Sequence, residues 1–171
     1  MRARALGIAA GLLGIPLGCA DPVHDNQVSA LGPEVAGVGP GPRHRPGQPC
    51  LACHGGSGPG SPQFSVAGTI YAAKDQATPL PAVGVQLVDA NGALKSATTN
   101  EAGNFYIPVD QWEPTNPLHV SLKYKTVTRE MTAHIGRSGS CADCHFNPPG
   151  PSTPGPVYVV LETGDLPGAS P

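Results

Sequence analysis

Two five-residue segments contain the residues whose types and spacing could do chemistry. They are Cys50-Leu51-Ala52-Cys53-His54 and Cys141-Ala142-Asp143-Cys144-His145, and both read Cys-x-x-Cys-His. Two thiols at this spacing can each form a thioether bond with one vinyl group of a single porphyrin, and the adjacent histidine is then held beneath the iron. The pattern therefore predicts two covalently bound haem c groups, with His54 and His145 as their proximal axial ligands.

The same cysteines allow other interpretations. Two CxxC pairs also occur in four-cysteine zinc sites, and each pair could instead form a disulfide loop or a redox-active dithiol. None of these alternatives explains why a histidine follows the second cysteine in both motifs. We therefore favour haem over zinc and over disulfides.

Each haem iron can take a second axial ligand, and two histidines stand at similar distances before the motifs. His44 lies six residues before Cys50, and His134 lies seven residues before Cys141. This repeated arrangement makes both histidines candidate distal ligands, and it leaves open which haem each one would serve.

The other candidate ligands have weaker support. Met131 falls at an expected core position of a strand, so it is an alternative ligand of lower weight. His119 alternates with apolar residues, which places it on the polar, exposed face of a strand, and His24 follows no partner pattern.

The beginning of the chain has the features of an export signal. Arg2 and Arg4 precede an apolar run over residues 5–18 that is too short for a comfortable transmembrane helix. The sequence Leu17-Gly18-Cys19-Ala20 resembles a bacterial lipobox. We therefore expect a signal peptide over residues 1–18 and acylation of Cys19, which would attach the protein to a membrane.

The lipobox also bears on location. Ala20 is not acidic, so the resemblance to lipoprotein sorting signals implies an outer-membrane lipoprotein that faces the periplasm or the cell surface. Pro16 stands where lipoboxes usually carry leucine, so cleavage after Ala20 and a soluble periplasmic protein remain the alternative.

Charge and composition limit the function classes. Ten basic and twelve acidic side chains give a net charge of −2, and no basic run indicates nucleic-acid binding. Gly and Pro make up 16 of the 32 residues from 31 to 62. This composition predicts that residues 31–62 are extended and form no helix or strand. We expect a flexible tether over residues 19–42, followed by a loop that carries the first motif.

From Phe64 onward, apolar residues recur at every second position, which is typical of half-buried strands. Ala90-Asn91-Gly92 provides a tight hairpin turn, and Pro108 favours an edge position for its strand. We predict an all-β fold, a small sandwich in a domain spanning 43–165, followed by a disordered tail over 166–171. The seven expected strands cover residues 64–71, 83–87, 94–99, 105–109, 118–124, 127–131 and 157–161.

Three segments of this region resemble a known family. They are Val66-Ala67-Gly68-Thr69-Ile70, then residues 81–87, then Thr99-Asn100-Glu101-Ala102-Gly103-Asn104-Phe105. Their order is similar to carboxypeptidase-regulatory-like and Cna-B-like domains, which are transthyretin-like sandwiches, and the resemblance covers residues 64–135. It implies a structural or binding scaffold rather than a catalytic one. Pro81-Ala82 departs from the usual Leu-Ala-Gly or Leu-Pro-Gly, and haem motifs are not part of the ordinary domain.

Together these features resemble an exported dihaem c-type cytochrome built on such a sandwich. The expected function is electron transfer between redox protein partners at the cell envelope, as a carrier rather than an enzyme. Two other classes stay open: a haem enzyme or gas or redox sensor with an open axial position, and a surface binding module in which haem or metal is structural. The resemblance to transthyretin-like sandwiches also implies that the first and last strands run side by side and parallel, which would bring both motifs to one end of the sandwich.

Overall fold

The computed structural model describes residues 21–34, 36–145 and 150–168. The expected signal peptide and Cys19 lie outside the described residues, as do residues 169–171 of the expected tail. No helix in the described part of the chain is long and apolar enough to cross a membrane.

Two four-stranded sheets form the sandwich, as the alternating pattern predicted. In the first sheet β1 (Phe64–Ala73) lies between β2 (Gln76–Pro79) and β5 (Asn104–Pro108) and also pairs with β8 (Val157–Val160). The order of the second sheet is β4-β3-β6-β7, in which the strands are β3 (Gly84–Val88), β4 (Leu94–Thr98), β6 (His119–Tyr124) and β7 (Val127–Glu130).

The core lies between the two sheets. Ile70, Ile107 and Val159 of the first sheet and Val85 and Leu87 of the second are almost fully buried. These residues come from the apolar positions of the alternating pattern, so burial of one face of each strand explains the two-layer arrangement.

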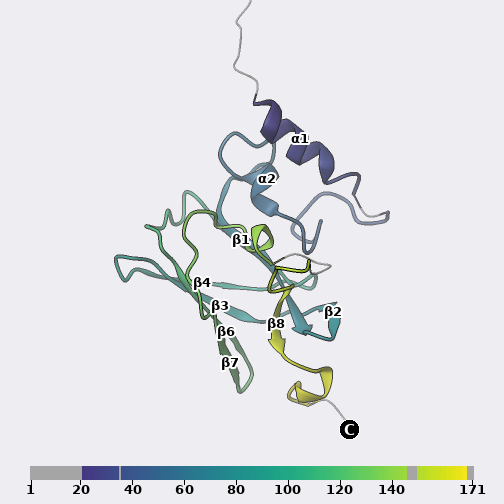
Figure 1. Cartoon of the computed structure of the whole chain (residues 1–171), viewed down its shortest axis with the longest axis vertical. Helices are drawn as coiled ribbons and strands as arrows, with labels where there is room; N and C mark the ends of the chain where they lie inside the picture. The colour runs from purple at the N-terminus through teal and green to yellow at the C-terminus, as the bar shows by residue number, and fades with distance from the viewer. Residues whose placement is uncertain (1–20, 35, 146–149, 169–171) are drawn as a thin grey trace, which may run out of the picture.

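The register of β1 decides where the two motifs lie. β1 pairs in parallel with β8, with Ile70 opposite Val157 and Ala73 opposite Val160, as the sequence led us to expect for the first and last strands. Just before the second motif, Ser140 forms a further parallel bridge with Ala67, in the first half of β1. Both motifs therefore lie beside the beginning of β1. The first motif forms α2 (Cys50–His54), which Figure 1 shows next to β1, and the second begins with the 3-10 helix η1 (Cys141–Asp143).

The N-terminal part of the domain differs from the expectation. The segment predicted as a flexible tether contains helix α1 (Pro22–Ala30), because the Asp21 carboxylate caps it by accepting the N–H groups of Val23 and His24 at 3.1 Å each. The first motif is also helical, in α2, although half of the surrounding residues are Gly or Pro. The Asp21 cap thus overrides composition at α1, whereas α2 forms without a side-chain cap.

Two details of the strands also differ. β2 was not predicted, since its four residues carry no alternating apolar pattern. The sandwich therefore has eight strands among the described residues rather than seven. A further 3-10 helix, η2 (Thr163–Asp165), follows β8.

Candidate functional site

Two cavities contain the two motifs, one each. Site 1 is a cavity of about 420 Å³ lined by Cys50, Cys53, His54 and His44 together with apolar side chains. Site 2 is a cavity of about 480 Å³. Its lining includes Cys141, Cys144, His145, His134 and Met131. Both volumes lie within the range of about 300–1,000 Å³ that is usual for cofactor sites.

The two motif histidines make the same hydrogen bond. His54 Nδ1 lies 2.7 Å from the carbonyl oxygen of Pro62, and His145 Nδ1 lies 2.8 Å from that of Gly155. A carbonyl oxygen only accepts, so each Nδ1 carries the proton and each Nε2 keeps its lone pair for a metal. Metal-binding histidines are usually oriented in this way, and the residues therefore fit the axial role that the motif assigns to them.

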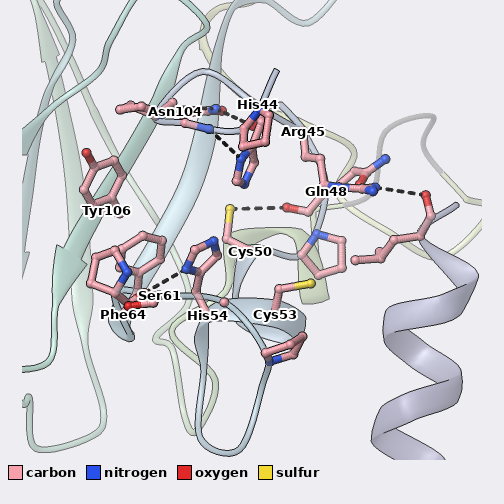
Figure 2. A pocket seen from close by; sticks show the side chains of 18 of the residues that line it. His44, Arg45, Gln48, Cys50, Cys53, His54, Ser61, Phe64, Asn104 and Tyr106 are labelled. Carbon is pink, nitrogen blue, oxygen red and sulfur yellow. Dashed lines mark hydrogen bonds between the residues drawn. The ribbon is translucent and has the colours of Figure 1, made fainter. Parts of the chain in front are cut away.

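The ring of His54 is held by aromatic neighbours (Figure 2). It stacks on Phe64 with ring centroids 4.4 Å apart, and Phe64 stacks on Tyr106 at 4.6 Å. His54 is buried, so its carbonyl partner and the stacked rings together limit its rotation.

His44 lies in the same cavity as His54, as Figure 2 shows. Their ring centroids are 5.7 Å apart and their planes differ by 26°. Two imidazole rings on either side of one metal, with metal–nitrogen bonds of about 2 Å, have centroids about 6 Å apart. One difference from the motif histidines is that His44 Nδ1 accepts a hydrogen bond of 3.3 Å from the Gly41 N–H, so ligation through Nε2 requires this bond to break.

Two buried polar residues of the sandwich anchor the backbone around His44. Asn104 Nδ2 donates to the His44 carbonyl at 3.0 Å, and Thr69 Oγ1 donates to Asn104 Oδ1 at 2.7 Å while it accepts from the Gly47 N–H at 2.7 Å. Both side chains are at most 6% exposed. The sandwich therefore positions the loop that precedes the first motif.

Arg45 joins this loop to the segment after α1. Its guanidinium group pairs with Glu34 at 3.0 Å and donates to the carbonyl oxygens of Leu31 and Gly32. Leu31 and Glu34 also line site 1, so the N-terminal segment forms part of its wall.

The candidate ligands of site 2 come from the chain around β7. His134 is exposed and Met131 is half-buried, and both line the cavity. His119 was expected to be exposed but is half-buried, because its ring lies beside that of His134 with centroids 5.7 Å apart. The sequence did not indicate this neighbour, since the pairing depends on the path of the chain after β7.

The thiols differ from ordinary cysteines. Burial raises the pKa of Cys50 to about 11, and burial followed by the charge of Cys50 raises the pKa of Cys141 to about 12. The four motif cysteines are free thiols. Within residues 21–34, 36–145 and 150–168, no three His, Cys, Asp or Glu side chains converge as a metal-binding group. The thiols are thus not arranged as the four-cysteine cluster of a structural zinc site.

Each candidate distal histidine shares a cavity with one motif, an assignment that the sequence left open. His44 accompanies the first motif and His134 the second, while His24 lines neither site. The residues that sequence reasoning missed are Thr69, Asn104, Phe64 and Arg45, which support the sites through partners distant in the sequence. No family model, curated protein or solved structure significantly matches the chain.

Proposed function

We propose that this protein is a dihaem cytochrome c that carries electrons between redox proteins at the cell envelope. The observation that carries the proposal is the repeated orientation of His54 and His145, whose Nδ1 atoms both donate to backbone carbonyl groups. The chemistry supplied by bound haem is a one-electron change between ferric and ferrous iron.

The chain's own residues have three tasks in this function. The motif cysteines would hold the porphyrin through thioether links. The motif histidines would present Nε2 to the iron. Apolar side chains from both sheets, such as Ile70, Val85 and Val120 in site 2, exclude water from the cavities.

Covalent attachment of haem takes place outside the cytoplasm, which agrees with the expected signal peptide and the expected acylation of Cys19. In this proposal the lipid anchor keeps the domain at the membrane, and both electron donor and electron acceptor are redox proteins.

The mass of the exported chain tests the proposal. When produced in a host with cytochrome c maturation, the wild-type chain should carry the mass of two haem groups. Cys50→Ala/Cys53→Ala and Cys141→Ala/Cys144→Ala should each carry one. A chain without added haem, containing zinc or two disulfides instead, would overturn the proposal.

One observation favours a second candidate function. His44 Nδ1 accepts from Gly41, which is the wrong protonation state for ligation through Nε2. If this bond persists in the loaded protein, site 1 has an open axial position and the protein is a haem enzyme or gas sensor. Binding of carbon monoxide to half of the haem would support this function.

A further inference from the structure

The two sites lie on opposite faces of one strand. The Thr69 hydroxyl of β1 accepts a hydrogen bond from the N–H of Gly47, which lies three residues before the first motif. A Cβ atom added to Gly68, the preceding residue of β1, would instead point toward Cys141 of the second motif. Neighbouring residues of a strand face opposite sides of the sheet. The wall between the sites is thus the backbone of β1.

Gly68 is where this wall is thinnest. A Cβ atom at this position would lie 2.5 Å from Cys141 Sγ, 2.7 Å from Cys141 Cβ and 3.1 Å from Phe105 Cε1. Gly68 is buried and pairs in register with Phe105, which lines both cavities. Only glycine lets the second motif approach β1 this closely.

Both motifs lie against β1, since α2 and η1 each contact this strand. Figure 1 shows α2 next to the start of β1, and Ser140, the residue before η1, forms a bridge with Ala67 in the same part of β1.

We propose that Gly68 sets the separation of the two haem sites and that an electron passes between them across β1, where Phe105 lines both cavities. This inference rests on the proposed function. One electron leaves the ferrous site, which is oxidised, and reaches the ferric site, which is reduced. A reduced redox protein supplies the electron and an oxidised one removes it, and no proton or bond moves.

Gly68→Ala in the exported full-length protein tests the inference, and Gly84→Ala is the matched control. Gly84 also lies in a strand, but a Cβ there would be 3.6 Å from the nearest atom, the Lys123 carbonyl oxygen, which is ordinary contact. The readout is the circular dichroism of the Soret band, since two nearby haems give a paired positive and negative signal that weakens with distance. We expect this signal in the wild type and in Gly84→Ala. In Gly68→Ala it should fall toward that of Cys141→Ala/Cys144→Ala, which carries only site 1.

A second background separates steric contact from general damage. Cys141→Gly removes both atoms of Cys141 that the added methyl group would meet and leaves Cys144 to bind the second haem. In Cys141→Gly protein whose mass shows two haems, Gly68→Ala should change the signal much less than it does in the wild type. An equal change in both backgrounds, or an unchanged signal in Gly68→Ala, would overturn the inference.

A redox titration tests the coupling even if Gly68→Ala is not exported. The midpoint potential of site 1 should shift when site 2 is removed by Cys141→Ala/Cys144→Ala, because the charge of one iron acts on the other. An unshifted potential contradicts the inference while two haems in the wild type still uphold the proposed function. A wild type without haem means instead that the proposed function itself has failed.

Discussion

The carbonyl oxygen of His44 accepts a hydrogen bond of 3.0 Å from the side-chain amide of Asn104, a buried residue of β5. Asn104 is held in turn by Thr69 of β1. A candidate distal ligand in a Gly- and Pro-rich loop is thus positioned by the rigid sandwich rather than by its own sequence neighbours.

The first prediction concerns this anchor. Asn104→Ala should lower the free energy of unfolding by about 1–3 kcal/mol, because it leaves buried hydrogen-bonding groups without a partner. It should also release the His44 loop, so that site 1 gains high-spin haem that binds carbon monoxide. Denaturant unfolding and absorption spectra measure the two effects. Asn91→Ala, at the exposed β3–β4 turn, serves as the control and should change neither.

The second prediction concerns His44 itself. His44→Ala should convert half of the haem to a carbon-monoxide-binding form, because only site 1 contains this residue. His24→Ala is the control, since His24 lies on α1 and lines neither site. If His44→Ala leaves the spectrum unchanged, His44 is not a ligand, and an already open site 1 would favour the enzyme or sensor function.

A third prediction separates the candidate ligands of site 2. His134→Ala should open the other half of the haem to carbon monoxide, whereas Met131→Leu should not. His119→Ala reports whether the neighbouring ring supports His134 or replaces it as ligand. If His119→Ala or Met131→Leu instead opens half of the haem to carbon monoxide, the substituted residue is the distal ligand of site 2.

The fourth prediction uses the protonation of Cys50 in protein made without haem. Alkylating reagents react with the thiolate, and a rise of the pKa from 9.0 to about 11 lowers the thiolate fraction near neutral pH. Folded protein should therefore be alkylated at Cys50 about 100-fold more slowly than the same chain in denaturant. The rate should increase with pH up to about 11. Peptide mass spectrometry measures the rates, and equal rates in both states would show that the buried environment of the thiol does not exist before haem attachment.

The sequence was informative where chemistry and periodicity are local. The alternating pattern predicted a two-sheet sandwich. The parallel pairing of the first and last strands, with Ile70 opposite Val157, was implied by the resemblance to transthyretin-like sandwiches rather than by the pattern. The spacing within each motif indicated that its two cysteines and its histidine would share a cavity, because those residues are adjacent in the chain. It did not indicate which motif His44 or His134 would accompany.

The supporting contacts could not be predicted in the same way. Asn104 lies 60 residues from His44, and the partners of His54 and His145 are backbone carbonyls whose positions follow only from the folded loops. Helix α1 was missed because the prediction of a tether followed the Gly and Pro content, although Asp21 as N-cap and Pro22 at the start of the helix are local start signals. Composition alone carries neither kind of information.

The most direct test of the central claim is an absorption spectrum with haem quantitation on protein exported from a host with cytochrome c maturation. The proposal predicts two covalent haems per chain with low-spin bands that carbon monoxide does not change. Two haems with a high-spin, carbon-monoxide-sensitive component would contradict the electron-carrier function and favour an enzyme or sensor. A chain without covalent haem would contradict the central claim itself.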